Sequence, residues 1–250
     1  MRRSEKVFVV EGVKLLRAAL DAGAPLESVF VDAAARSDPA VAGVVAEALG
    51  RGARVFDLAP GVLERVADTV TPQPVLALVG MPEATLDELA RATFVVVCAE
   101  VRDPGNAGAV IRVADAAGAD AVVCCEGTVD PFNPKTVRAS AGSVLHLPVV
   151  VAGEAGDVLD ELGRAGLVRV AAVARGGEPY TGVDLTARLA LVLGNEASGV
   201  PARLDGRIDV RVTIPMAGGA ESLNVSTAAA VLCFEAARRR SNLLAMEDAR

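Results

Sequence analysis

Three glycine-bearing loops, each placed after an apolar run, carry the side chains best suited to binding and orienting a ligand. These side chains offer two amides, one carboxylate, one hydroxyl and one guanidinium: Asn106, Arg112, Glu196, Ser222 and Asn224. Glycine lacks a Cβ, so the backbone of such loops can approach a ligand closely. A guanidinium is permanently protonated and suits phosphate oxygens. The three loops therefore predict a site that holds a ligand beside a phosphate-bearing partner.

The first loop covers residues 100–112 and opens a predicted helix. Gly105 and Gly108 permit close backbone approach, and Asn106 can cap the helix while still offering its amide to a ligand. An ordinary strand-to-helix turn with a cap explains these three residues equally well. It leaves Arg112 unexplained, because Arg112 would lie about two turns into the helix on the same broad face as the glycines. We expect Arg112 to reach a phosphate.

The second and third loops are less specific when each is taken alone. In parallel α/β sheets ligands bind beyond the carboxyl ends of strands, and Gly194 in the loop 194–201 would leave room there for a cofactor. Glu196 alone is also compatible with a surface position. In the loop 215–226, Ser222 can cap the following helix, whose first N–H groups are unpaired. One proline and two glycines make that loop more elaborate than capping requires.

Two alternating series of strands and helices position these loops. Residues 1–80 read as a small α/β domain, residues 81–92 as a connection, and residues 93–250 as a second α/β domain. Continuous apolar runs such as 94–99 and 189–193 are typical of strands that are buried on both faces of a parallel sheet. The fold class predicted from the sequence is therefore α/β.

Composition and charge narrow the classes of function. The net charge of −7 excludes a protein that coats nucleic acid indiscriminately, so any contact with RNA must be local. Apolar runs stay far below the roughly 20 residues of a membrane span, and no signal peptide is recognisable, so we expect a cytoplasmic protein. The four cysteines lie in apolar segments without chelating pairs, and only one histidine is present, so we expect no metal. The few aromatic residues of the first domain, Phe8, Phe30 and Phe56, are expected to be buried.

The order of the motifs resembles that of the SpoU/TrmH family within the SPOUT methyltransferases. The first matching motif is Asp-Pro-x-Asn-x-Gly-x-x-x-Arg at 103–112, and the second is Leu-Gly-x-Glu-x-x-Gly at 193–199. The third has two parts, Ile-Pro-Met at 214–216 and Ser-Leu-Asn-Val-Ser at 222–226. The segment 133–142 also looks like the stretch between the first and second motifs of that family. Together the resemblance covers residues 93–240, and three ordered matches are highly specific.

This resemblance implies a fold and an activity. The second domain would be an open parallel sheet with a deep C-terminal trefoil knot, and the first would be similar to ribosomal protein L30e and grip the RNA. Family members are typically homodimers whose active sites draw on both subunits. They transfer a methyl group from S-adenosyl-L-methionine to a ribose 2′-hydroxyl of RNA. An N-terminal domain similar to L30e favours ribosomal RNA as the substrate.

The resemblance also assigns roles to residues. The residues implied to bind the cofactor are Leu193, Gly194, Ile214, Met216 and Leu223. The catalytic face would comprise Asn106, Arg112, Glu196, Ser222 and Asn224. In the family, the arginine that matches Arg112 is assigned as the base that activates the hydroxyl. Because a guanidinium donates rather than accepts hydrogen bonds, we expect Arg112 instead to bind the adjacent phosphate and orient the ribose.

Three alternatives remain open at this point. The substrate can be transfer RNA, or the chain can be a noncatalytic RNA-binding protein that retains the fold. Alternating strands and glycine-rich turns also suit a dinucleotide-binding oxidoreductase, although Gly-x-Gly-x-x-Gly does not follow the first strand of either half.

Overall fold

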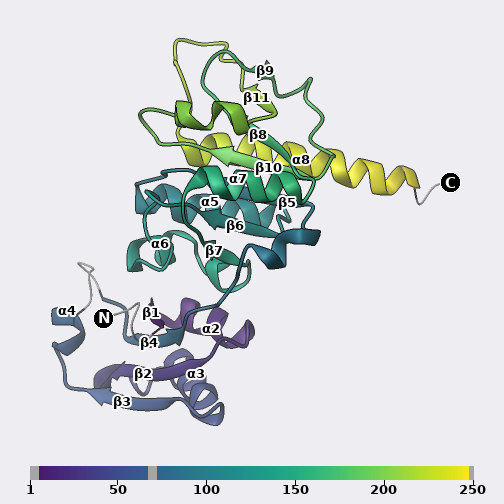
Figure 1. Ribbon diagram of the computed structural model, residues 1–250. Helices are drawn as coiled ribbons and strands as arrows, with labels where there is room; N and C mark the ends of the chain where they lie inside the picture. Colours follow the sequence, from purple (N-terminus) through teal and green to yellow (C-terminus); the bar gives the residue numbers. More distant parts are fainter. Residues whose placement is uncertain (1–5, 67–71, 248–250) are drawn as a thin grey trace.

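A computed structural model describes residues 6–66 and 72–247 and contains two sheets, each with its own helices (Figure 1). The smaller sheet is built from β1 (Val7–Glu11), β2 (Leu26–Asp32), β3 (Arg54–Leu58) and β4 (Val75–Gly80). Its strand order is β1-β4-β2-β3. β4 pairs antiparallel with both β1 and β2, whereas β2 and β3 are parallel, so this sheet is mixed.

Helices cover one face of the smaller sheet. The amphipathic helix α2 (Val13–Asp21) buries Leu16 and Leu20, and α3 (Pro39–Gly50) packs beside it. A third, shorter helix, α4 (Val62–Val66), was not expected from the sequence. Residues along β4 alternate between buried and half-buried, as a sheet with one covered face requires.

The aromatic residues of this domain differ in their burial. Phe8 is completely buried, as expected. Phe56 is 43% exposed and stacks on Phe30, with ring centroids 5.4 Å apart and ring planes 18° from parallel. The expectation that Phe56 is buried is wrong, because β3 pairs only with β2 and forms the edge of the sheet.

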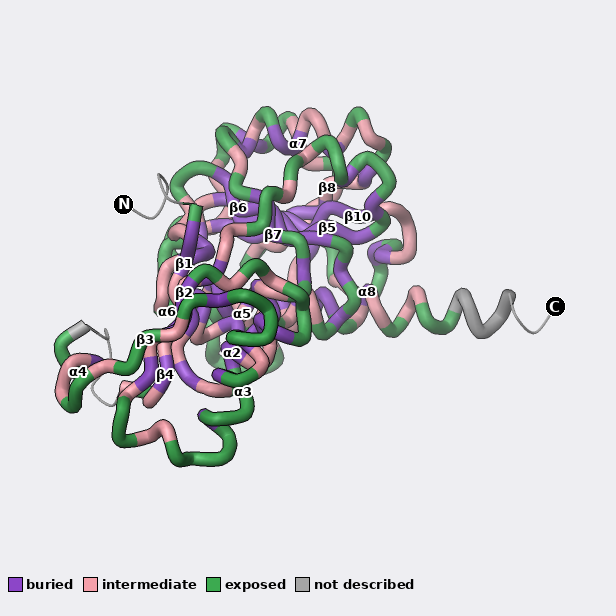
Figure 2. Tube along the Cα trace, turned by 90° about the horizontal axis from the view of Figure 1, so that it is seen from below, coloured by how far each residue is buried: buried purple, intermediate pink, exposed green. Residues whose placement is uncertain are grey.

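The larger sheet is parallel throughout. Its strands are β5 (Phe94–Cys98), β6 (Ala121–Cys124), β7 (Val149–Val151), β8 (Val168–Ala172), β9 (Glu178–Pro179), β10 (Leu189–Leu193) and β11 (Val210–Thr213). Every residue of β5 and β10 is buried (Figure 2), which confirms the interpretation of their continuous apolar sequences. Only β9, two residues long, was not expected.

The strand order of this sheet, β7-β6-β5-β10-β8-β11-β9, fixes where a ligand can bind. From β5 the chain first moves outward through β6 and β7, and it then continues on the other side of β5. The order therefore reverses between β5 and β10, and the loops after these two strands diverge at that point. Such a reversal at the carboxyl ends of parallel strands is the usual ligand site of open α/β sheets.

Helices cover both faces of the larger sheet. On one face lie α5 (Pro104–Ala116), α6 (Pro134–Ala139) and α8 (Val225–Glu247). On the other lie α7 (Ala155–Arg164) and the short helix η4 (Ala202–Arg207). Odd and even residues of β5 belong to these two different apolar clusters, as the alternation of side chains along a strand dictates.

The two domains share one apolar core. The cluster that includes α5 and α8 continues without interruption into the smaller domain, where Phe8 and Leu15 belong to it. The intervening segment contains the short helix η2 (Asp87–Arg91), and the guanidinium of Arg188 donates hydrogen bonds to the carbonyl oxygens of Ala90 and Ala92. The division into residues 1–80, 81–92 and 93–250 stays a prediction.

Two arginines near the end of α8 hold the segment between β9 and β10. Arg239 donates to the carbonyl oxygens of Val183 at 2.8 Å and Thr181 at 2.6 Å. Arg240 donates to the carbonyl oxygen of Ala187 at 2.6 Å. Because α8 also packs along α5, these contacts fix the segment between β9 and β10 against the larger domain.

No helix in residues 6–66 and 72–247 combines the length and apolar character needed to cross a membrane.

Gly108 lets α5 and α6 pack in close contact. A Cβ at this position would lie 2.5 Å from the carbonyl oxygen of Thr136 and 2.5 Å from the Cβ of Ala139. The backbone that approaches Gly108 is therefore that of α6. The close backbone approach expected at this glycine is confirmed, and its partner is α6.

Replacement of Gly108 by alanine should lower the free energy of unfolding by about 1–3 kcal/mol, because the new Cβ must displace backbone. The matched change Gly43→Ala in α3 meets nothing within 4 Å and should instead stabilise by about 0.5–1 kcal/mol. Urea denaturation of both variants measures the difference. Similar effects of the two substitutions would contradict the packing explanation.

Candidate cofactor pocket and active site

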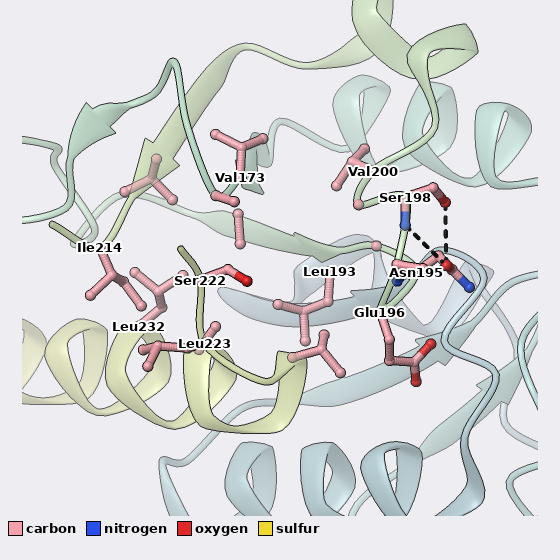
Figure 3. Close-up of a pocket in the computed structure, with 18 of the residues that line it drawn as sticks. Val173, Leu193, Asn195, Glu196, Ser198, Val200, Ile214, Ser222, Leu223 and Leu232 are labelled. Carbon is pink, nitrogen blue, oxygen red and sulfur yellow. Dashed lines mark hydrogen bonds between the residues drawn. The ribbon is translucent and has the colours of Figure 1, made fainter. Parts of the chain in front are cut away.

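A cavity of about 310 Å³ opens at the carboxyl ends of β8, β10 and β11. All five residues expected to bind a cofactor line it: Leu193, Gly194, Ile214, Met216 and Leu223. Figure 3 shows Ile214 and Leu223 on one side, Ser198 and Val200 on the other, and Leu193 between them. The structure thus brings together the second and third motifs, which are separated in the sequence by β11 and η4.

Gly194 is required by the loop that follows it. A Cβ at this position would lie 2.1 Å from the carbonyl carbon of Gly199 and 2.2 Å from the nitrogen of Val200. The loop folds back because Asn195 and Gly199 exchange two backbone hydrogen bonds, each of 2.9 Å. Gly194 therefore leaves room for its own loop, and the cavity lies beside that loop. The expectation that Gly194 leaves room for a cofactor stays a prediction.

Asn195 shapes this loop and was missed as a site residue. Its Oδ1 accepts hydrogen bonds from the backbone N–H groups of Ala197 at 3.0 Å and Ser198 at 3.2 Å. Its Nδ2 donates to the carbonyl oxygen of Glu100 at 3.1 Å. One amide thus folds the loop after β10 and joins it to the end of β5 across the reversal point of the sheet.

Three of the predicted catalytic residues form a continuous chain of hydrogen bonds. Glu196 Oε1 accepts from Asn106 Nδ2 at 3.0 Å, and Asn106 Oδ1 accepts from Asn224 Nδ2 at 2.9 Å. Each residue comes from a different one of the three loops. The side-chain amide of Asn106 is therefore held in one orientation, with its oxygen toward α8 and its nitrogen toward Glu196.

Glu196 also binds the backbone at the start of α5. Its two carboxylate oxygens accept from the N–H of Asp103 at 3.1 Å and that of Arg102 at 3.3 Å. Desolvation is the largest influence on its pKa and raises it, but the hydrogen bonds from Asn106, Asp103 and Arg102 together outweigh desolvation and lower the pKa below its ordinary value. Glu196 is thus held as an anion between two loops.

The helix caps differ from those expected. Asp103 caps α5 by accepting from the N–H of Asn106 at 2.8 Å, and Asn224 caps α8 by accepting from the N–H of Ser226 at 2.8 Å. Capping by Asn106 and by Ser222 was therefore wrong. The side chain of Asn106 is free of capping and available for its two amide contacts. Ser222 lies three residues before the first residue of α8 and lines the cavity.

Glu100 is a second residue that the sequence did not single out. It has a left-handed backbone with φ of 69° and follows β5 directly. Its N–H donates to Thr128 Oγ1 at 3.1 Å, and its carbonyl oxygen accepts from Asn195. Its carboxylate binds Arg203 at 2.8 Å and Arg102 at 3.0 Å. Hydrogen bonding from Arg203 is the main reason that the pKa of Glu100 is lowered.

One signal in the sequence pointed toward Glu100. A charged residue immediately after five buried apolar residues lies at the carboxyl end of a central strand, where ligands bind. Its partners Asn195 and Arg203 are far away along the chain, so no local spacing indicated that they meet. A strained backbone at such a place is held by the contacts around it.

Arg112 lies apart from the other predicted catalytic residues. It is exposed on α5 and does not line the cavity. Within residues 6–66 and 72–247, no hydrogen bond or ion pair engages its guanidinium. The structure of one chain thus joins Asn106, Glu196 and Asn224 beside the cavity, with Ser222 in its wall, and leaves Arg112 free for another contact.

Glu196→Gln should weaken the junction of the two loops. Glutamine keeps one acceptor oxygen but presents an NH₂ group to backbone N–H donors. Because this side chain is exposed to solvent, at pH 7 we expect a loss of about 0.5–1 kcal/mol in the free energy of unfolding. The folded-state pKa is lowered, so the contribution of the carboxylate is present above its unfolded value of about 4.3 and is lost as pH falls through the folded value.

Chemical denaturation at pH 7 and below pH 4 tests this expectation. The difference between Glu196→Gln and the unsubstituted protein should shrink at the lower pH. The exposed Glu178 provides the control, and Glu178→Gln should change stability little at either pH. An equal loss for Glu196→Gln at both pH values would show that its charge is not responsible.

Comparison with known proteins places this geometry in a family. The model of the SpoU rRNA Methylase family matches residues 93–234, and that of the MRM3-like substrate binding domain matches residues 1–77. The chain is 36% identical to the 23S rRNA (guanosine(2553)-2′-O)-methyltransferase RlmP of Bacillus subtilis, over 93% of this chain and 89% of the relative.

Two solved structures are similar over nearly the whole chain. One is the SpoU methyltransferase AviRb from Streptomyces viridochromogenes in complex with AdoMet, with a TM-score of 0.85, 32% identity, and coverage of 96% of this chain and 92% of that one. The other is an AdoMet-bound rRNA methyltransferase from Sinorhizobium meliloti, with a TM-score of 0.84, 32% identity, and coverage of 95% and 89%. The three motifs, the parallel sheet and these matches agree, and the chain belongs to the SpoU rRNA Methylase family.

Proposed function

We propose that this protein transfers a methyl group from S-adenosylmethionine to a ribose 2′-hydroxyl of 23S-type ribosomal RNA in the cytoplasm. The observation that carries this proposal is the chain Glu196–Asn106–Asn224, which borders the cavity at the reversal point of the sheet. The relatives that match nearly the whole chain are named as rRNA methyltransferases. The match of residues 1–77 to a substrate-binding domain also supports a large RNA as the substrate.

The cavity suits S-adenosylmethionine. Ile214, Leu223 and Leu232 form an apolar wall for an adenine ring, and the folded loop after β10 presents backbone groups for its polar edge. A volume of about 310 Å³ lies within the usual range of small-molecule sites. When bound, S-adenosylmethionine supplies an electrophilic methyl group. Leu193 and Met216 would complete the walls, and Gly194 would act through the loop that it permits.

The residues beside the cavity provide orientation more than acid–base chemistry. Transfer to a hydroxyl requires the oxygen to lie in line with the donated methyl group, and holding that geometry lowers the barrier by several kcal/mol. Asn106 is fixed by Glu196 on one side and Asn224 on the other, so its amide is a rigid element for positioning the ribose. The hydroxyl of Ser222, in the cavity wall, would contact the reacting nucleotide.

We propose that the active protein is a homodimer. Arg112 is exposed and lies outside the cavity of its own chain, so a second copy would bring its Arg112 to the cavity. There the guanidinium would bind the phosphate next to the target ribose, because its positive charge and its planar set of N–H donors match phosphate oxygens. A trefoil knot is also part of the proposal. Its support is the segment 214–224, which lines the cavity together with the loop after β10.

Transfer of tritium from labelled S-adenosylmethionine to RNA tests the activity. The acceptors are 23S rRNA and transfer RNA from cells that lack the gene, followed by mapping of 2′-O-methylated nucleotides. Label in 23S rRNA at one ribose is the expected result. Label in transfer RNA alone would overturn the choice of substrate, and donor binding without transfer to either RNA would indicate a noncatalytic binding protein.

Arg112→Ala should reduce methyl transfer by about 10²-fold or more, because a donor aimed at the reacting nucleotide is lost. Binding of S-adenosylmethionine, measured by calorimetry, should be unchanged, since Arg112 does not line the cavity. Arg91→Ala, at an exposed arginine in η2, serves as the control and should be fully active. Activity of Arg112→Ala equal to that of the control would remove Arg112 from the mechanism.

A further inference from the structure

Glu11, the last residue of β1, joins the two domains. Its carboxylate is only 7% exposed. One oxygen accepts a hydrogen bond from Arg138 Nη1 in α6 at 3.1 Å, and the other accepts from the backbone N–H of Gln73 at 3.1 Å. A single carboxylate therefore connects the end of β1, the segment before β4 and a helix of the catalytic domain.

Apolar contacts surround this ion pair. The rings of Phe8 and Phe132 lie 5.1 Å apart, and both side chains are buried. Gly142, after α6, has a φ of 104°, and a Cβ built on it would lie 3.2 Å from the Cβ of Ala18 in α2. We call this set of contacts, with Glu11–Arg138 at its centre, the interdomain joint. The joint has the burial of a core, which is unlike the wet and polar interfaces of mobile domains.

The joint continues directly to the catalytic helix. α6 carries Arg138 on the side of β1 and packs against α5 at Gly108, where no side chain separates the two helices. α5 carries Asn106 in its first turn and Arg112 two turns later. The first domain thus contacts α6, and α6 contacts α5, which carries the residues proposed to orient the ribose.

We propose that Glu11 and Arg138 are positioning residues that hold the first domain at a fixed distance and angle from the active site. The inference rests on the proposed function, and it adds how the substrate is selected. An RNA is methylated only when the element gripped by the first domain and the target ribose are separated by the span that the joint sets. The fixed distance between the two domains therefore selects the nucleotide, and the interdomain joint sets that distance.

The burial of Glu11 explains why one substitution should loosen the joint. Removal of the guanidinium leaves a nearly buried carboxylate with one charged partner fewer, which is much more costly than the loss of an exposed ion pair. The domains can relieve that cost by separating and admitting water. A looser joint tolerates several spacings, so site choice should broaden.

The experiment compares Arg138→Gln and Glu11→Gln on two substrates. One is unmodified full-length 23S rRNA, and the other is a short stem-loop that contains the mapped ribose but nothing for the first domain to grip. On the long RNA, we expect KM to rise by about tenfold, which corresponds to about 1.4 kcal/mol, and additional riboses to be methylated. On the stem-loop, and in binding of S-adenosylmethionine, both variants should match the unsubstituted enzyme.

Asp209→Asn is the matched control. It removes the ion pair Asp209–Arg169 at 2.7 Å, which lies within the catalytic domain and away from the joint and whose carboxylate is 38% exposed. Its KM and site choice on the long RNA should be unchanged. The double variant Glu11→Gln with Arg138→Gln should lose less than the sum of the two single variants, because the contact that the two residues share is already weakened in each single variant.

Two results would overturn the inference. One is normal site choice and KM of Arg138→Gln on the long RNA, and the other is an equal loss on both RNAs, which would indicate a local role in α6. A failure of the unsubstituted enzyme to methylate any RNA would contradict the proposed function instead. In that case small-angle scattering tests the joint. Arg138→Gln should have a larger radius of gyration than Asp209→Asn, and equal radii would contradict the proposed role of the joint.

Discussion

The site depends on one anion, Glu196, placed where the strand order of the larger sheet reverses. Its oxygens bind the amide of Asn106 and the backbone that begins α5, so two loops that leave the sheet in different directions are tied together. Partial desolvation raises the pKa of this carboxylate, but the donors that converge on it outweigh that effect and lower the pKa. The loop after β10, the start of α5 and, through Asn106, the start of α8 all take their relative positions from this carboxylate.

Backbone features make that convergence possible. Gly194 allows the loop after β10 to fold onto itself, and the left-handed Glu100 turns the chain away from β5 so that its carbonyl meets Asn195. Gly108 removes the side chain that would separate α5 from α6. These positions serve the approach of protein to protein, and the cavity is what remains beside them. The rigidity of the site is thus a property of the scaffold and precedes any ligand.

The sequence predicted the sheet and the cavity because both depend on local patterns. Continuous apolar runs indicated β5 and β10, and the resemblance of the motifs selected five of the residues that line the cavity. Contacts between distant segments were not predictable in this way. Glu100 and Asn195 are 95 positions apart, and either Asp103 or Asn106 has the chemistry of a helix cap. The glycines were recognised as points of close approach, but their partners depend on tertiary packing. The roles of the site residues stay predictions.

The attachment of the segment between β9 and β10 has an evolutionary consequence. Arg239 and Arg240 bind it only through main-chain oxygens, which every amino acid possesses. The residues of 181–187 whose side chains point to solvent are therefore free to diverge in identity while the path of the chain is preserved, whereas Val183 and Leu185 are buried in the core and must stay apolar. The two arginines have no such freedom, because no other side chain supplies a rigid fork of permanently charged donors. We therefore expect sequence changes to be concentrated at the exposed positions of the segment between β9 and β10, and Arg239 and Arg240 of α8 to be retained.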